Sequence, residues 1–388
     1  MKNLVLIDLL CAQPFGAIKY HGGGEYTKAV FKQVTSFWDK KITELTVFYN
    51  YDLFIDEWIL DIIKEQGIHA INVCSYSDIA HYINSLSYSD NITFFAGLIN
   101  QYESINLTKT IRTIGTCHGL RQLEKDFDIT QYFYTNSFKD LLRTLYYHIN
   151  RRRLFQINYN LYKNCLLKFN NIVTVSNHSQ YSIRNVFASI CNDKRIMTLY
   201  TPSKVYDRTF PISDENFIMM VSADRWIKNS YRGIMAIDTL YSQGLILGMK
   251  TRIYGNLPKY IMNKIKNPEC FEFYGYVSTN ELEQAYSQCS LFFYPTLNEG
   301  FGMPPIEAQK YGKTCVISAV ASLTEIYADS VYYCNPYDIQ EMSTRILEAY
   351  NEKIHVSKIF KNYERISSKQ QKDLEFLANL ILCNKTIY

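Results

Sequence analysis

Two glutamates stand eight positions apart around a loop that could bind a sugar or a phosphate. The stretch from Pro295 to Ala308 reads PTLNEGFGMPPIEA, with Glu299 before an expected helix and Glu307 within it. Pro305 suits the first turn of that helix, whose start would offer backbone N–H groups and a positive dipole end. Carboxylates also accept hydrogen bonds from sugar hydroxyls. An ordinary strand-to-helix loop with two solvated glutamates fits the same spacing.

A second loop carries two basic residues, Arg225 and Lys228, between an expected strand and an expected helix. Arginine and lysine in such a place can clamp a diphosphate, because charge-assisted hydrogen bonds are strong. Ordinary surface charge is the simpler explanation of these two residues taken alone.

The first half of the chain contains two further candidates. Gly22, Gly23 and Gly24 open the first expected helix and would let a ligand approach the backbone closely. The run is not G-x-G-x-x-G, so a dinucleotide-binding fingerprint is absent. His118 follows an expected strand, where catalytic side chains are often found, although a single histidine is more often structural.

Together these segments resemble the family 4 glycosyltransferases, which are retaining enzymes of the GT-B fold with an E-x7-E signature. The resemblance covers most of the chain, is strongest over about 217–350 and extends throughout the segment from Phe271 to Tyr337. It is carried by Gly275–Val277, the strand ending at Pro295, Glu299–Gly302, Glu307-Ala308, Leu323–Glu325 and Asn335–Asp338.

The resemblance implies roles for the loop residues. Glu299 would contact hydroxyls of the donor sugar near the anomeric carbon, and Glu307 would bind the ribose. Backbone amides of Gly300, Phe301 and Gly302 would hold the sugar or its phosphates.

The resemblance also implies roles for residues outside that loop. Lys228 and Arg225 would neutralise the diphosphate leaving group; the family usually separates this Arg and Lys by five positions rather than three, so Lys228 matches better. His118 would touch the donor sugar. The segment 22–24 would lie near the donor phosphates and the acceptor, and the backbone of Tyr276 and Val277 near the nucleotide base.

These inferences predict a retaining glycosyltransferase that moves a hexose-type sugar from a nucleotide-sugar to an acceptor hydroxyl. Bacterial surface polysaccharide or glycolipid assembly is the expected setting. A non-catalytic nucleotide-sugar-binding subunit and a GT-B sugar-nucleotide epimerase are the alternatives. Asp126-Phe127-Asp128 matches a metal-binding DxD pattern, but GT-B enzymes typically need no metal, and we expect no metal or other cofactor.

Residues 139–168 have a net charge of +6, with apolar side chains between the basic ones. A basic amphipathic helix of this kind can lie on an anionic membrane. A solvated helix packed on the first domain is equally consistent with the pattern. The expected protein is therefore cytoplasmic, with peripheral contact at the inner face of the membrane as a further prediction.

The chain must position these residues with 388 amino acids, enough for two or three domains. A hydrophobic fraction of 47% excludes disorder, and a net charge of only +4 argues against a nucleic-acid partner. No apolar run reaches the length of a membrane span. Ten cysteines without a CxxC pair indicate reduced thiols in the cytosol.

Short apolar runs alternate with amphipathic stretches throughout the chain, which favours parallel α/β sheets. We therefore expect a GT-B architecture, with two Rossmann-like doubly wound domains that face an interdomain cleft. The first would span residues 1–203 and bind the acceptor; the second would span 214–360 and bind the nucleotide-sugar. A linker lies between them, and a helical tail at 361–388 would pack back on the first domain.

Overall fold

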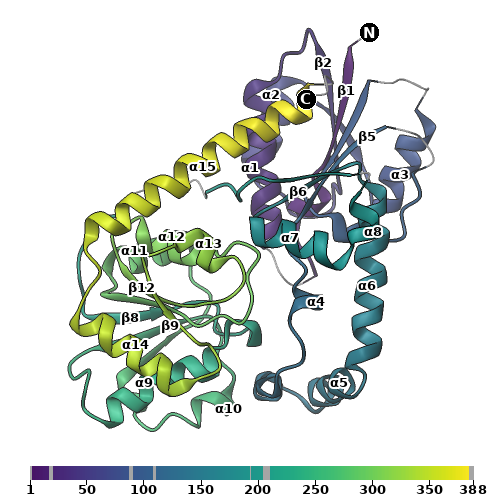
Figure 1. Cartoon of the computed structure of the whole chain (residues 1–388). Helices are drawn as coiled ribbons and strands as arrows, with labels where there is room; N and C mark the ends of the chain where they lie inside the picture. Colours follow the sequence, from purple (N-terminus) through teal and green to yellow (C-terminus); the bar gives the residue numbers. More distant parts are fainter. Residues whose placement is uncertain are drawn as a thin grey trace. The chain divides into compact units, whose positions relative to one another are not determined.

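The structure, a computed structural model, describes residues 2–16, 21–86, 91–107, 111–192, 194–203 and 210–383. These residues form two compact units (Figure 1). The first unit contains Met1–Leu120, Gln156–Lys204 and Ser367–Tyr388, and the second contains Arg121–Phe155 and Val205–Ile366. Residues 204–209 of the expected linker and 384–388 of the expected tail lie outside the described residues.

The first unit is built on a parallel sheet in the order β3-β2-β1-β4-β5-β6-β7. Its strands are β1 (Asn3–Asp8), β2 (Thr43–Tyr49), β3 (His69–Asn72), β4 (Ile92–Ala96), β5 (Arg112–Cys117), β6 (Asn171–Thr174) and β7 (Arg195–Thr198). The apolar runs at 3–10, 42–50, 69–75, 91–97, 110–117 and 171–176 predict six of these strands. The sequence analysis missed β7, a four-residue edge strand whose alternation is too short to recognise.

Helices of the first unit connect these strands. They are α1 (Gly22–Phe37), α2 (Glu57–Gln66), α3 (Tyr76–Ser85), α7 (Asn177–Val186) and α8 (Ala188–Cys191), with 3-10 helices η1 (Leu10–Ala12) and η2 (Ile99–Gln101). The spacing of Ala29, Val30, Val34 and Phe37 predicts one apolar stripe on α1; Val30 and Val34 are fully buried, whereas Phe37 is 42% exposed. Ser176 caps α7 by accepting a hydrogen bond from the backbone N–H of Ser179, as its sequence position indicates.

The second unit contains a parallel sheet in the order β10-β9-β8-β11-β12-β13. Its strands are β8 (Phe217–Met220), β9 (Lys250–Tyr254), β10 (Phe271–Tyr274), β11 (Leu291–Tyr294), β12 (Thr314–Ser318) and β13 (Tyr332–Cys334). The apolar runs at 217–223, 250–255, 270–277, 290–296, 314–320 and 330–335 predict all six. β8 and β11 are buried along their whole length, as central strands of a doubly wound sheet must be.

Helices cover both faces of this sheet. In Figure 1, α9 and α14 lie on one side of it, and α11, α12 and α13 lie on the other. The helices are α9 (Ser230–Ser242), α10 (Lys259–Met262), α11 (Thr279–Gln288), α12 (Met303–Gln309), α13 (Leu323–Tyr327) and α14 (Ile339–Asn351), with η4 (Trp226–Lys228) and η5 (Pro268–Cys270). The core between α9, α14 and the sheet contains the fully buried Ile237, Phe293 and Ile346.

The second unit also includes the segment Arg121–Phe155, which comes from the first half of the chain. It contains α4 (Arg121–Glu124), η3 (Ile129–Tyr134) and α5 (Phe138–Ile149). Phe133 of η3 packs edge-on against Tyr231, and the Tyr134 hydroxyl accepts a hydrogen bond from the Tyr231 N–H at 3.0 Å.

Two long helices each contribute to both units. They are α6 (Arg151–Lys168) and α15 (Val356–Leu382). The basic stretch 139–168 was expected as one helix. It forms two, because α5 ends at Ile149 with Asn150 as its C-cap and α6 begins at Arg151. Within the first unit, Asp373 of α15 accepts a hydrogen bond from the Tyr200 N–H at 2.8 Å. Among the described residues, no helix combines the length and apolar character that crossing a membrane requires.

Candidate active site

Lys228 and Glu299 form a buried ion pair at the carboxyl ends of β8 and β11. Lys228 is 5% exposed and Glu299 is 7% exposed. The ammonium group of Lys228 donates a hydrogen bond to Oε1 of Glu299. The same carboxylate oxygen accepts from the Tyr294 hydroxyl at 2.7 Å and from Thr296 Oγ1 at 3.0 Å. The two residues selected from separate sequence motifs are therefore in direct contact.

The environment keeps both members of this pair charged. Burial on its own would raise the pKa of Glu299, but the charges of Lys228 and Arg121 hold that pKa at about 2. Burial lowers the pKa of Lys228 to about 8, although the Glu299 carboxylate acts against this shift. Near neutral pH the pair consists of a carboxylate and an ammonium group.

Backbone geometry brings Lys228 to this position. Lys228 ends η4, and the following Asn229 adopts a left-handed conformation with φ of 58° before α9 begins. The fully buried Asn229 amide donates to the carbonyls of Pro295 at 3.0 Å and Pro336 at 2.6 Å. The Leu297 N–H also donates to the Ile227 carbonyl at 2.8 Å, which fixes the loops after β8 and β11 to one another.

The glycine-bearing loop after β11 is held by hydroxyl groups from the α13 region. Ser322 Oγ donates to the carbonyls of Glu299 at 3.0 Å and Phe301 at 3.1 Å. The Tyr327 hydroxyl donates to the Gly302 carbonyl. Gly302 has φ of 88°, and a Cβ there would lie 2.4 Å from a methyl group of Leu323, so only glycine fits. The loop is therefore rigidly positioned.

Glu307 is buried within α12, as the sequence pattern predicts. The charges of both Glu307 and Glu299 act on the Tyr327 hydroxyl and raise its pKa, after the larger effect of burial. Glu299 is 7% and Glu307 4% exposed, so the interpretation of the two as solvated surface residues is wrong.

Basic side chains surround the buried pair. Arg121 Nη2 lies 3.9 Å from Glu299 Oε2, and its side chain is partly exposed. Arg225 is exposed, and its charge and that of Arg121 both lower the pKa of Lys228, after the larger effect of burial. Sequence analysis missed Arg121, although its position three residues after His118, at the start of a helix following β5, was a usable signal.

The residues assigned to the nucleotide base lie at the end of β10. Tyr276 is 77% exposed, and its hydroxyl donates to Asp224 Oδ2 at 2.9 Å. Asp224 belongs to the same loop as Arg225, so the β8 and β10 loops meet here. Val277 is half-buried next to Tyr276.

The two aspartates of the DxD pattern have different surroundings. Asp128 is buried, caps η3 through the Thr130 N–H at 2.9 Å and pairs with Arg232 at 3.2 Å. Asp126 is exposed and lies 3.6 Å from Arg151. Within the described ranges, no group of three histidine, cysteine or acidic side chains is arranged to hold a metal ion. Both aspartates therefore have structural partners.

In the first unit, His118 follows β5 with its ring half-buried. Nε2 lies 2.9 Å from the Gly97 carbonyl, so this nitrogen carries the proton and donates. The ring packs edge-on against Tyr26 at 4.8 Å between centroids. Burial lowers the pKa of His118 to about 4, so the imidazole is neutral at physiological pH and Nδ1 can accept a hydrogen bond.

The three glycines form the first turn of α1, and close packing explains one of them. His21 caps the helix by accepting from the Gly24 N–H at 3.1 Å. A Cβ on Gly23 would lie 2.6 Å from the Leu98 side chain, whereas one on Gly22 would meet nothing within 4 Å. Packing therefore requires glycine at position 23, while position 22 remains open for a ligand.

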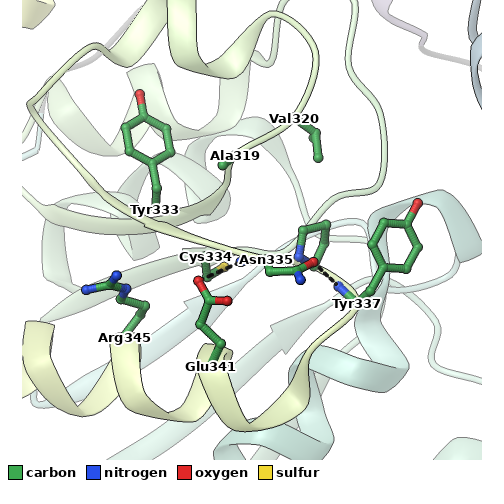
Figure 2. A pocket seen from close by; sticks show the side chains of 9 residues that line it. Ala319, Val320, Tyr333, Cys334, Asn335, Tyr337, Glu341 and Arg345 are labelled. Carbon is green, nitrogen blue, oxygen red and sulfur yellow. Dashed lines mark hydrogen bonds between the residues drawn. The ribbon is translucent and has the colours of Figure 1, made fainter.

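A cavity of about 450 Å³ lies at the carboxyl ends of β12 and β13 (Figure 2). Tyr333, Asn335, Tyr337, Glu341 and Arg345 contribute to its lining. Figure 2 shows a hydrogen bond between Tyr337 and Asn335, from the Tyr337 N–H to Asn335 Oδ1 at 3.0 Å. None of the site residues selected from the sequence lines this cavity.

Comparisons with known proteins show which proteins this chain is similar to. Residues 204–372 match the family described as glycosyl transferases group 1. The O-antigen chain mannosyltransferase RfbU of Salmonella typhimurium is 23% identical over 223 residues, which cover 56% of this chain and 58% of RfbU. The serotype-specific mannosyltransferase WbdA of Escherichia coli is 37% identical over 76 residues, which cover 20% of this chain and 9% of WbdA.

Solved structures with the same fold cover nearly the whole chain. Sucrose-phosphate synthase from Thermosynechococcus elongatus has a TM-score of 0.65 at 12% identity. The alignment covers 97% of this chain and 96% of the synthase chain. Anabaena HepE in complex with UDP and glucose has a TM-score of 0.62 at 11% identity, with coverage of 98% and 97%. The two parallel-sheet units are thus the Rossmann-like domains of the GT-B fold, as the sequence predicts.

Proposed function

We propose that the chain is a group 1, GT4-type glycosyltransferase, and specifically a retaining hexosyltransferase with a nucleotide-sugar donor; its residues 204–372 match the group 1 family. The observation that carries this proposal is the buried contact between Lys228 and Glu299. It joins the cation expected to hold the diphosphate to the carboxylate expected to hold the sugar.

The charges around this contact support a diphosphate ligand. Burial first, and then the charges of Arg225 and Arg121, lower the pKa of Lys228, which supports a cluster of three cations beside Glu299. When the glycosidic bond breaks, the leaving diphosphate gains negative charge. Fixed cations in a water-poor site stabilise that charge most in the transition state.

Glu299 is better suited to position the sugar than to attack it. Its Oε1 already accepts from Lys228, Tyr294 and Thr296, which reduces the nucleophilicity of the carboxylate. We therefore propose that the acceptor hydroxyl attacks on the face that the leaving group vacates. In this mechanism Glu299 accepts donor-sugar hydroxyls, and Glu307 binds the ribose.

The remaining site residues complete the proposal. The amides of Gly300, Phe301 and Gly302 contact the donor, and the backbone of Tyr276 and Val277 contacts the base. Nδ1 of His118 accepts a hydrogen bond from a sugar hydroxyl. Gly22, Gly23 and Gly24 contribute to binding near the donor phosphates and the acceptor.

We propose a sugar of a surface polysaccharide or glycolipid as the acceptor, because the relatives RfbU and WbdA are named for O-antigen or serotype-specific mannosyl transfer. Mannosyl donors are accordingly the first to test. The proposal includes domains at 1–203 and 214–360, a tail at 361–388, and peripheral contact of 139–168 with an anionic membrane. It includes no nucleic acid, no metal and no other cofactor. Turnover measured with and without a chelator tests the absence of a metal.

A thermal-shift screen with UDP-, GDP-, ADP- and dTDP-sugars identifies the donor. A ligand at 100 times its dissociation constant adds about 2.7 kcal/mol to the free energy of unfolding. Proton NMR of the product made with an oligosaccharide acceptor then reports the anomeric configuration. An inverted product would refute retention. Conversion of the donor without an acceptor would indicate an epimerase, and binding without any turnover would indicate a binding subunit.

A further inference from the structure

Helix α5 is amphipathic, but the structure leaves its apolar side uncovered. None of its twelve residues is buried. Phe138 is 74% exposed and Ile149 is 72% exposed, at opposite ends of the helix. With 100° per residue, most of the exposed apolar side chains fall on one stripe, formed by Phe138, Leu141, Leu142, Leu145, Tyr146 and Ile149, whereas Tyr147, which is 43% exposed, lies outside it.

The opposite side of α5 faces the rest of its unit and is polar. Asp140, Thr144 and His148 are spaced four residues apart and are half-buried. The His148 ring stacks on Phe127 with centroids 4.3 Å apart, and its Nδ1 lies 3.0 Å from the Tyr132 hydroxyl. This orientation is the reverse of an ordinary surface helix, whose apolar stripe faces the core.

Basic side chains lie along and just beyond this apolar stripe. Lys139 and Arg143 are on α5, and Arg151, Arg152 and Arg153 begin α6 at once after it; all five are exposed. Within the described residues, Arg143 pairs with Asp140 at 2.9 Å and Arg151 lies near Asp126. Arg152 and Arg153 have no ion-pair partner there, so residues 138–155 present a net positive, apolar surface.

We infer that α5 lies in the interface of an anionic lipid bilayer, with its apolar stripe among the acyl chains and the arginines of 151–153 at the headgroups. Exposed apolar patches of this kind mark interaction sites. A symmetric contact between two copies would place five basic residues against five others, whereas anionic lipid complements them. This inference deepens the proposed membrane contact, but it needs no glycosyl transfer to be true.

The test is sedimentation of the full chain with phosphatidylcholine vesicles that contain or lack phosphatidylglycerol. Replacing Arg151, Arg152 and Arg153 by Gln should reduce partitioning onto the anionic vesicles about a hundredfold at low salt. A triple change of Lys259, Lys264 and Lys266 to Gln removes the same charge from another exposed segment of the unit. This control should bind nearly as wild type does.

The apolar stripe is tested by Leu142→Gln with Leu145→Gln, against the control Leu245→Gln with Leu247→Gln. All four leucines are exposed, so both variants should keep the thermal unfolding midpoint of wild type. The α5 pair should lose about tenfold in partitioning, and this loss should persist at high salt, where electrostatic attraction is screened. The control pair should lose little.

Three results would overturn the inference. The first is equal vesicle binding by wild type, the arginine variant and the α5 leucine variant. The second is a dimer in analytical ultracentrifugation that the α5 leucine variant alone dissociates, with vesicle binding unchanged. The third is loss of RNA binding in the arginine variant with vesicle binding unchanged. Donor turnover is assayed separately with a water-soluble acceptor, so failure of the proposed enzyme activity leaves the vesicle result readable.

Discussion

Each unit buries one carboxylate at the carboxyl end of a central strand, and the two carboxylates have opposite properties. Glu299, after β11, pairs with Lys228, and its pKa is held at about 2. Asp8, the last residue of β1, is fully buried and accepts from the Tyr102 hydroxyl at 2.8 Å and the Leu10 N–H at 2.8 Å. Burial raises the pKa of Asp8 to about 6, since its hydrogen-bond donors are neutral.

The difference shows that burial alone does not determine the charge of a site. Desolvation raises the pKa of both carboxyl groups, and only a neighbouring cation reverses the result. The second unit therefore has a fixed charge pair suited to an anionic donor. The first unit instead has Asp8, which titrates near pH 6 and is mainly ionised at neutral pH, and the neutral ring of His118.

Removing the cation should make Glu299 resemble Asp8, and this is the largest effect we predict. Lys228→Met leaves a buried carboxylate without its charge partner, which should lower the free energy of unfolding by about 3–5 kcal/mol at neutral pH. Urea denaturation measures the loss. The double variant with Glu299→Gln should recover part of it, because the unpaired charge is then gone.

Arg225→Met is the matched control for this experiment. It removes a cation of the same loop from an exposed position, so the free energy of unfolding should change by less than about 0.5 kcal/mol. A loss below about 1 kcal/mol for Lys228→Met would mean that the pair is not the buried charge contact described above.

The two signature glutamates should differ in what they affect. Glu299→Gln should reduce turnover about a hundredfold or more, while affinity for the nucleoside diphosphate stays nearly constant, because that ligand has no donor sugar. Glu307→Gln should weaken donor and nucleoside diphosphate alike, since both contain the ribose. Calorimetry with the diphosphate and turnover with the donor separate the two patterns. Equal loss of diphosphate affinity in both variants would contradict the assigned direction of the donor.

Much of this site could be predicted from the sequence, because many of its residues lie close together along the chain. The loop from Glu299 to Glu307 lies within one strand-loop-helix unit, so residue types and turn signals already indicated its position. The two sheets followed from apolar runs separated by amphipathic helices. The edge strand β7 escaped notice because four residues carry too little periodicity.

The contacts across the fold could not be predicted in the same way. Nothing local links Lys228 to Glu299, which are 71 residues apart, or Arg121 to either of them. The orientation of α5 was also hidden, because an amphipathic pattern indicates a helix but not which face packs. That face depends on Phe127 and Tyr132, which hold His148 against the unit.

The two carboxylates should give pH dependences of opposite sign. Asp8 has a folded pKa of about 6 against 3.8 in the unfolded chain, so its stabilising contribution is complete below pH 3.8 and is lost as pH rises through 6. Relative to Asp8→Asn, wild type should therefore lose about 2–3 kcal/mol of unfolding free energy over that range.

Glu299 should behave in the reverse way. Its folded pKa of about 2 lies below the unfolded value of 4.5, so its contribution is present above pH 4.5 and is lost as pH falls towards 2. Urea titrations of wild type, Asp8→Asn and Glu299→Gln across this range measure both slopes. Slopes of the same sign for the two carboxylates would contradict the comparison.

The smallest effect should come from His118, the neutral group of the first unit. With a pKa of about 4, its ring stays uncharged from pH 5.5 to 8, so kcat/KM should show no inflection near 6.5 from this residue. His118→Asn keeps a donor for the Gly97 carbonyl, 2.9 Å from the present Nε2, but loses the acceptor at Nδ1. We expect about a tenfold fall in kcat/KM, equivalent to one hydrogen bond, with an unchanged unfolding midpoint. A wild-type inflection near pH 6.5 that disappears in His118→Asn would instead identify a titrating, acid–base role for this ring.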